Sequence, residues 1–249
     1  MFIIDAHAHI GDCRVFDLFV NPVELINTMD QCGVHAAIVM PFPGAKDVKR
    51  VHDEIAELGQ NYPGRVFGMV NMNPHCSPED YFAEAYRCVK HLGFVGLKLH
   101  TIGHAVNPIS QDARVVFQTA RELSVPVMVH TGPGIPFALP TLLLSRAKEF
   151  SDVKIVVAHA GFTLFTPEAY ILASECRNVY LETSWLFPDD IHWLVSALGA
   201  QRVMMGSDLP RNLQPSLQII ESANLTEAEK RWVLGQTAIE VFKLKVKEV

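Results

Sequence analysis

The N-terminal stretch Met1-Phe-Ile-Ile-Asp-Ala-His-Ala-His-Ile10 combines the apolar pattern of a strand with two histidines, His7 and His9. Alternate residues of a strand point to the same face, so both imidazoles are expected on one side of it. Such a pair can bind a metal ion, although neighbouring histidines on a strand are also common as ordinary polar residues. The remainder of the chain has to decide between these two interpretations.

Seven further apolar runs follow this stretch, and segments with helix start and stop residues separate them. The runs are rich in Val, Ile, Leu and Met throughout, which is typical of parallel strands buried on both faces. The eight predicted strands are 2–10, 36–40, 66–72, 95–100, 125–130, 154–159, 179–183 and 203–207. Because no linker interrupts the series, the sequence predicts one domain over residues 1–249, a TIM-type (β/α)8 barrel. A doubly wound open sheet is the alternative, but no Gly-x-Gly-x-x-Gly turn follows the first strand.

Helix boundaries between the strands carry ordinary capping residues. Helices are expected to begin at Asn21-Pro22, at Ser77-Pro78 and after Ser110, and the first two are expected to stop at Gly33 and Gly93. The segment Thr226-Glu-Ala-Glu229 is a capping box, so a last helix is expected from there to about Lys243. That helix would close the ring of strands or pack across its bottom.

Composition limits the classes of partner. The formal net charge of −6 gives nucleic-acid phosphates no general attraction, and no apolar run is long enough for a membrane span. The five cysteines are odd in number and scattered, so neither a disulfide framework nor a zinc knuckle is indicated. The N-terminus does not look like a signal peptide. We therefore expect a cytoplasmic protein with a small-molecule substrate and no nucleic-acid or membrane partner, and a homodimer is left open.

Ligand-type side chains occur where five of the predicted strands end. Besides the first strand, these ends read Gly96-Leu-Lys-Leu-His100, Val127-Met-Val-His130, Val156-Val-Ala-His159 and Met205-Gly-Ser-Asp208. A single histidine at a strand end is often only a polar residue near water. A closed barrel, however, brings all these ends to one mouth, where nitrogen and oxygen donors could surround a metal ion.

The ordered set of residues resembles the amidohydrolase superfamily, and more closely its amidohydrolase-related branch, which includes aminocarboxymuconate semialdehyde decarboxylase and lactone hydrolases. The resemblance spans essentially the whole chain. It implies that His7, His9, His130 and Asp208 hold one divalent metal ion, with zinc expected, and that His159 is a catalytic histidine beside it. The chain has only a brief loop after its first strand, so the substrate contacts of relatives are not carried over.

Lys98 and His100 are two residues apart, so they are expected on the inward face while Leu97 and Leu99 face the helices. A buried ammonium is costly unless it is paired. Lys98 could therefore bind a substrate anion, could be carboxylated and bridge two metal ions, or could pair with a buried acid such as Asp5. The first option is slightly favoured, and His100 and Arg14 are assigned to substrate binding with it.

The function predicted from these residues is metal-dependent hydrolysis of a small, anionic lactone, amide or ester. A bound metal ion lowers the pKa of water to about 7 and polarises a carbonyl group. Asp208 would accept the proton of that water, and His159 would orient the nucleophile or stabilise the developing oxyanion.

Three other functions stay open. The first is non-oxidative decarboxylation of a small unsaturated or aromatic acid, for which the same branch uses the same metal ligands. The second is a TatD-like deoxyribonuclease, but that family has a glutamate in the region of the fourth strand, where this chain has Lys98 and His100. The third is a barrel that binds metal without catalysis. A structural ion needs fewer ligands than the ligand-type residues that converge here, which argues against this function.

Overall fold

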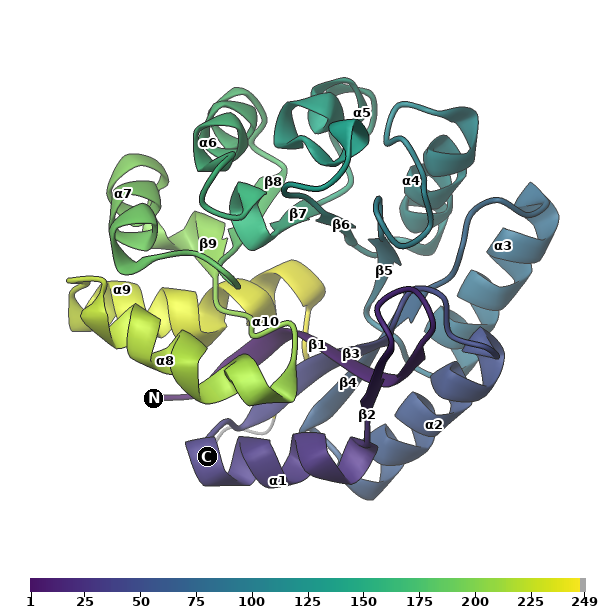
Figure 1. Ribbon diagram of the computed structural model, residues 1–249, viewed down its shortest axis with the longest axis horizontal. Helices are drawn as coiled ribbons and strands as arrows, with labels where there is room; N and C mark the ends of the chain where they lie inside the picture. The colour runs from purple at the N-terminus through teal and green to yellow at the C-terminus, as the bar shows by residue number, and fades with distance from the viewer. Residues whose placement is uncertain (247–249) are drawn as a thin grey trace.

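Strands form the centre of the molecule and helices surround them (Figure 1) in the computed structural model, which describes residues 1–246. The described strands make one sheet in the order β2-β1-β3-β4-β5-β6-β7-β8-β9, and every neighbouring pair except β1 and β2 is parallel. Their bounds are β1 Ile4–Cys13, β2 Leu18–Val20, β3 Ala36–Pro41, β4 Val66–Asn71, β5 Gly96–Leu99, β6 Val127–His130, β7 Ile155–Ala158, β8 Val179–Glu182 and β9 Val203–Met204.

Backbone contacts between the first and last strands close the sheet into a barrel. Ala8 and Asp208 form a parallel bridge, the Ala6 amide donates to the Met205 carbonyl at 3.0 Å, and the Asp208 amide donates to the His7 carbonyl at 2.7 Å. The predicted (β/α)8 barrel is therefore confirmed. The closure also brings His7 and Asp208, which are 201 positions apart in the sequence, into direct backbone contact.

The helices begin where the capping residues predicted. Asn21, Ser77 and Ser110 each accept a hydrogen bond from a backbone amide in the first turn, and Thr226 with Glu229 forms the expected capping box. The helix bounds are α1 Pro22–Cys32, α2 Val48–Asn61, α3 Pro78–Tyr86, α4 Gln111–Leu123, α5 Leu144–Glu149, α6 Thr166–Glu175, α7 Pro188–Leu198, α8 Leu213–Ser222, α9 Glu227–Arg231 and α10 Thr237–Phe242. A π-helical turn, Arg87–His91, extends α3, and another, Trp232–Gln236, joins α9 to α10.

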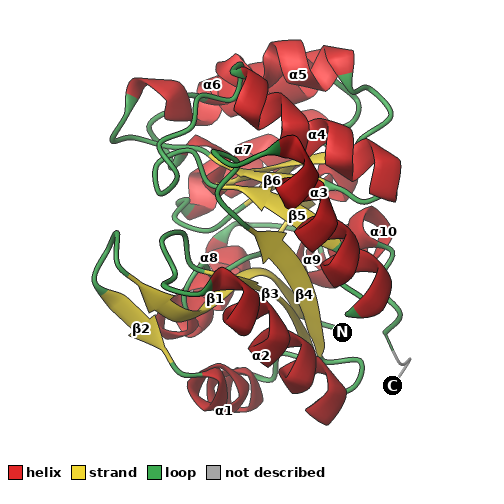
Figure 2. Cartoon of the chain, turned by 90° about the vertical axis from the view of Figure 1, so that its right-hand side faces the viewer, coloured by secondary structure: helices red, strands yellow, loops and turns green. Residues whose placement is uncertain are grey.

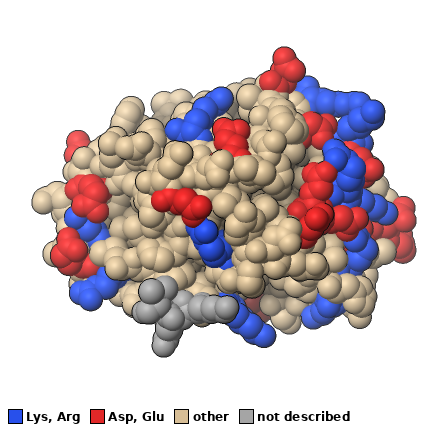
Figure 3. All heavy atoms as spheres, turned by 90° about the horizontal axis from the view of Figure 1, so that it is seen from below, with Lys and Arg blue, Asp and Glu red and all other residues tan. Residues whose placement is uncertain are grey.

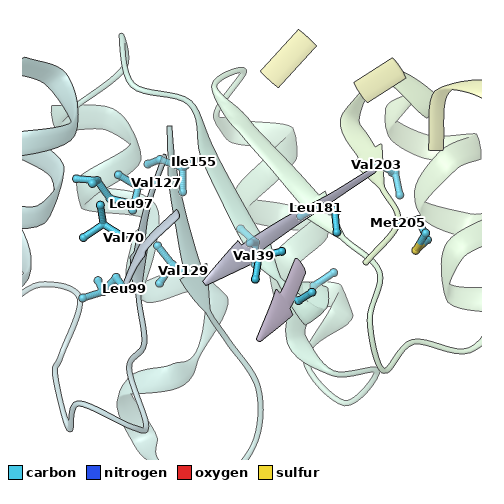
Figure 4. Close-up of a cluster of buried hydrophobic side chains, with 14 of the residues drawn as sticks. Val39, Val70, Leu97, Leu99, Val127, Val129, Ile155, Leu181, Val203 and Met205 are labelled. Carbon is cyan, nitrogen blue, oxygen red and sulfur yellow. The ribbon is translucent and has the colours of Figure 1, made fainter. Parts of the chain in front are cut away.

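Buried side chains form two layers. The larger layer lies between the sheet and the helices, and Figure 4 shows its branched side chains, among them Val39, Leu97 and Val127 on their strands. The smaller layer fills the barrel interior, and α10 contributes Val241 and Phe242 to it. The last helix thus packs across the bottom of the barrel, which is one of the two arrangements expected, and the opposite end is left for polar residues.

The first strand is longer than predicted, and β2 was missed. β1 continues past Ile10 to Cys13 and pairs with β2 in an antiparallel hairpin, with Gly11 opposite Val20. Figure 2 shows this hairpin projecting at the edge of the barrel. The three residues of β2 are too few to give a periodic signal, so cross-strand pairing rather than local pattern decides this element. Its position matters because it brings Phe16 and Leu18 to the mouth of the barrel.

Acidic and basic side chains are mixed over the surface seen in Figure 3, with no extended area of one sign. Such a surface offers no concentrated positive field for a polyanion. Within residues 1–246, no helix has both the length and the apolarity that a membrane crossing requires.

Candidate metal centre

Three of the four predicted metal ligands meet at the mouth of the barrel. The Nε2 atoms of His7 and His9 are 3.2 Å apart, and each lies 3.5 Å from Oδ1 of Asp208. All three ligand atoms lie within 4.8 Å of one another. The prediction that His7 and His9 share one face of β1 is confirmed, and Asp208 joins them because β9 lies next to β1.

Hydrogen bonds at the far side of each ring determine which nitrogen faces the centre. Nδ1 of His7 donates to Oε2 of Glu182 at 2.8 Å, and Nδ1 of His9 donates to the carbonyl of Pro41 at 2.9 Å. The neutral rings then carry their lone pairs on Nε2, the two atoms that face each other. Two imidazole lone pairs and a carboxylate oxygen converging without a proton between them fit a divalent cation. We call His7, His9 and Asp208 the metal cup.

His130, the fourth predicted ligand, lies in the same cavity but outside this group of three. Its Nδ1 is 3.1 Å from Nε2 of His159, whose Nδ1 is 2.7 Å from the hydroxyl of Ser184. Ser184 in turn donates to Oε2 of Glu182 at 2.9 Å. This series of hydrogen bonds places the His130 proton on Nδ1 and leaves a lone pair on its Nε2. That Nε2 is buried and has no hydrogen-bond partner in the described part of the chain, as expected of a group that awaits a ligand.

Lys98 is fully buried, and its Nζ lies 2.9 Å from Nε2 of His7. Lys98 and His100 lie inward and Leu97 and Leu99 outward, as predicted. The pairing with Asp5 is wrong, because the Asp5 carboxylate accepts hydrogen bonds from Ser207 and from the His7 amide. Burial lowers the pKa of Lys98, and the acids that oppose this effect are Asp208 and Glu182. Lys98 is not among the residues that line the cavity at the mouth of the barrel.

A cavity of about 360 Å³ opens above the metal cup. Histidines and Asp208 lie in its lining, and its walls are largely aromatic and aliphatic: Phe16, Leu18, Phe42, Phe162, Trp185 and Leu209. His100 also lines the cavity and stacks on His130 with a ring centroid separation of 4.4 Å. Because Nδ1 of His100 accepts from the Gly103 amide at 3.1 Å, its ring proton is on Nε2. His100 can therefore donate a hydrogen bond but cannot ligate a metal through Nδ1.

The cationic residue at the cavity differs from the one that the sequence favoured. Arg14, assigned to substrate binding, lies exposed in the β1–β2 turn and does not line the cavity. Arg211, just after Asp208, does line it. The difference arises because β1 continues into a hairpin, which moves Arg14 away from the strand end where it was expected.

Burial controls the charge of the site. It lowers the pKa of His9 to about 3, and burial together with the positive charge of Lys98 lowers the pKa of His7 and His130 well below the usual value. These imidazoles are neutral at pH 7, which is the state that binds metal. Burial raises the pKa of Asp208, which makes this carboxyl group easier to protonate than an exposed one.

Glu182 and Ser184 are functional candidates that the sequence reasoning missed. Both are buried at the end of β8. Glu182 accepts hydrogen bonds from His7 and from Ser184, and Ser184 also contacts His159. The signal was present, because Val179-Tyr-Leu-Glu182 is another apolar run that ends in a ligand-type residue. Trp185, which follows the same strand, donates its indole proton to Oδ2 of Asp208 at 2.9 Å.

Fold and site together define a (β/α)8 barrel with a group of histidines and a carboxylate that could hold a metal ion at the carboxyl ends of its strands. The model of the amidohydrolase family matches residues 4–244, so the chain belongs to this family. The superfamily expected from the motif order is confirmed. Membership supports an enzyme that binds a divalent metal ion.

Several of the similar proteins with a named reaction are decarboxylases, and one similar structure is that of a probable 2-pyrone-4,6-dicarboxylic acid hydrolase from Acinetobacter baumannii. The chain is 24% identical to gamma-resorcylate decarboxylase of Polaromonas sp. strain JS666, over 79% of this chain and 76% of the relative. The crystal structure of 5-carboxyvanillate decarboxylase from Sphingomonas paucimobilis is similar with a TM-score of 0.79 and 15% identity, over 98% of this chain and 99% of that one. The structure of dihydroxybenzoic acid decarboxylase from Polaromonas sp. JS666, solved with manganese and 2-nitroresorcinol, is similar with a TM-score of 0.76 and 19% identity. The match covers 99% of this chain and 98% of that one.

The expectation of hydrolysis as the main reaction is corrected by these comparisons. The curated relative is a decarboxylase that acts on an aromatic acid, which agrees with the alternative drawn from the sequence and not with its main prediction. The sequence could not separate the two reactions, because both are associated with the same metal-ligand residues.

Proposed function

We propose that this protein is a metal-dependent, non-oxidative decarboxylase of a small aromatic carboxylic acid. The observation that carries the proposal is the cavity itself, in which aromatic walls stand directly above the metal cup. A planar ring fits such walls, and donors at one end can hold its carboxylate. The named reaction of the curated relative supports the same class of substrate.

His7, His9 and Asp208 would hold one divalent ion, and His130 would be the fourth ligand; its buried Nε2, which has no hydrogen-bond partner among residues 1–246, supports this assignment. The ion supplies a positive charge that binds and orients the acidic substrate. Zinc was expected from the sequence, and manganese is present in several similar decarboxylase structures, so both are to be tested. The Nε2 proton of His100 and the guanidinium of Arg211 would bind the substrate carboxylate or a ring hydroxyl, since both residues line the cavity.

In the reaction, the bond between the ring carbon and the carboxylate breaks, carbon dioxide leaves, and the same ring carbon takes up a proton. Asp208 is the proposed proton donor, because among the residues that line the cavity it supplies the carboxyl group. His159 is a weaker candidate for this step, because its Nδ1 is engaged with Ser184 and its Nε2 accepts from His130. We propose that His159 instead orients His130.

The test is a screen of the zinc-loaded and manganese-loaded protein against hydroxylated benzoic acids. The expected result is carbon dioxide and the decarboxylated arene in equal amounts. We expect the Asp208→Asn protein to lose turnover by at least 100-fold, because it lacks both a metal ligand and the proposed acid catalyst. Cleavage of lactones or esters by the loaded protein, with no carbon dioxide from any acid, would overturn the proposal.

The number of metal ions is tested separately. We propose one ion per chain, and we expect an unmodified Lys98, since its Nζ faces Nε2 of His7 inside the barrel. Metal analysis should give one ion, and the intact mass should show no added carbon dioxide. Two ions per chain together with that added mass would contradict the mononuclear centre.

A further inference from the structure

Trp185 touches the metal cup from outside. Its indole Nε1 donates to Oδ2 of Asp208 at 2.9 Å, while the other oxygen, Oδ1, faces Nε2 of His7 and of His9 at 3.5 Å. The two carboxylate oxygens therefore have different partners. An indole nitrogen is a donor only, so this contact does not compete for the metal. A carboxylate held at one oxygen presents the other in a single orientation.

The backbone of this segment is held in an uncommon conformation. Trp185 has φ 66°, and Phe162, which follows the short turn His159–Gly161 after β7, has φ 60°; both lie in the left-handed region that bulky residues rarely adopt. Their rings stack, with centroids 5.4 Å apart and an interplanar angle of 16°. Strained conformations of this kind cost about 1–3 kcal/mol each and persist where the surroundings fix them, often at functional sites.

Trp185 is also accessible. It is 41% exposed, whereas most residues around the cup are buried, and it lines the cavity together with Phe162. A large aromatic side chain normally loses such exposure on folding because its burial is favourable. An indole that is fixed at its nitrogen and open to the cavity is in a position to contact a second planar ring.

We propose that Trp185 is a positioning residue: its indole proton fixes Asp208 for metal binding, and its ring, with Phe162, forms the surface on which the substrate ring lies. The first part depends only on the metal cup. The second part rests on the proposed function, since it requires an aromatic substrate. Binding of the substrate ring and orientation of the Asp208 carboxylate would then be linked through the Trp185 side chain.

Metal affinity in the absence of substrate tests the first part. We compare Trp185→Phe, which keeps an aromatic ring and loses the donor, with wild type in titrations of the metal-free protein with zinc and with manganese. The expected loss of affinity is about 10-fold, the lower end for removal of a hydrogen-bond partner of a metal ligand. Trp193→Phe is the matched control, because Trp193 packs on Tyr170 at 5.0 Å and does not line the cavity.

Trp185→Leu provides a second variant without the donor, and circular dichroism checks the fold of both. Unchanged metal affinity in both folded variants would overturn the positioning role. This result would leave the proposed reaction untouched, because no substrate is present in the assay.

Steady-state kinetics and fluorescence test the second part. Phe162→Leu keeps the indole donor, so we expect unchanged metal affinity and a KM for benzoic acids raised several-fold, whereas Trp185→Phe should mainly lower kcat. In the Trp193→Phe background, an aromatic acid should quench tryptophan emission, and the quenching should disappear when Trp185 is also replaced by Phe. If the ring surface is elsewhere, KM and quenching will not respond to either change, even where decarboxylation proceeds normally.

Discussion

Single residues at the strand ends adopt conformations that their neighbours impose. His159, Trp185 and Asp208 all have positive φ values, of 64°, 66° and 68°, although none is a glycine. Each turns the chain sharply after a strand and directs its side chain to the cup or its hydrogen-bonded surroundings. Nothing in the local sequence requires this geometry, so long-range packing and hydrogen bonds must hold these residues in place.

Gly206 shows how closely the cup is packed. A Cβ atom built at this position would lie 2.5 Å from Oε1 of Glu182 and 2.9 Å from Cβ of His7. We predict that Gly206→Ala displaces Glu182 from Nδ1 of His7 and weakens metal binding by about 10-fold or more, because this contact orients the ring. Metal titration measures the effect.

Gly59→Ala serves as the control for that substitution. Gly59 lies in α2, away from the cup. The atom nearest to a Cβ built at Gly59 is the carbonyl oxygen of Val66, at 3.1 Å. A gain in helix propensity of about 1 kcal/mol should offset that tight contact. Equal metal affinities of the two variants would show that the crowding at Gly206 does not reach His7.

Between elements, a buried polar cluster fastens α2, α3 and β4 outside the barrel. Nδ1 of His52 is 2.8 Å from Glu84, which also binds Arg87, and Nε2 of His52 accepts from the Asn71 amide at 3.3 Å. Although His52, Glu84 and Cys88 have metal-ligand chemistry, these hydrogen bonds already engage both nitrogens of His52 and both oxygens of Glu84. The cluster is therefore structural.

Because of this cluster, we expect part of the free energy of unfolding to be lost at acid pH. Burial alone would raise the pKa of Glu84, but the hydrogen bonds from His52 and Arg87 outweigh it and lower the pKa from 4.5 to about 2. A lowered folded-state pKa means that the contribution is complete above about pH 4.5 and is lost as the pH falls towards 2. Glu84→Gln should thus destabilise the protein at pH 7 by about 2 kcal/mol, the scale of a charge-assisted hydrogen bond.

Urea unfolding of both proteins between pH 7 and pH 3 measures this difference, which should shrink as the pH falls below 4.5. Asp53→Asn is a suitable companion variant, since Asp53 meets the same Arg87 at the exposed surface and should contribute far less. A stability gap between Glu84→Gln and wild type that stays constant over the whole pH range would contradict the lowered pKa.

At the scale of the whole molecule, metal binding and folding are linked, because the cup exists only when β1 and β9 meet. A ligand at 100 times its Kd stabilises the folded state by about 2.7 kcal/mol. For a chain of this length, about 1 kcal/mol changes Tm by roughly 2–4 °C. We therefore predict that removing the metal with a chelator lowers Tm by about 5–10 °C, as measured by calorimetry.

The Asp208→Asn protein should show little of this change, since it lacks one side of the cup. A wild-type Tm that does not respond to chelator or to added metal would argue against a metal site formed by folding. Equal responses of wild type and Asp208→Asn would instead place the metal elsewhere in the molecule.

The sequence by itself determined the alternation of strands and helices, the closed barrel as its best solution, and the polar residues at the strand ends. Strand burial, capping and the inward direction of Lys98 depend on neighbours a few positions away, so local pattern is sufficient to predict them. The three-residue β2 was missed because its partner, not its own pattern, defines it.

Only the tertiary structure decided which of those polar residues touch. Closure of β1 against β9 joins His7 and His9 to Asp208. The neighbouring ends of β6 and β7 pair His130 with His159, and Glu182 at the end of β8 reaches His7 on β1. It also directs Lys98 to His7 and keeps Arg14 away from the cavity. These contacts depend on ring closure, hairpin pairing and the sharp turns after the strands, which join residues up to 201 positions apart and leave no periodic trace in the sequence.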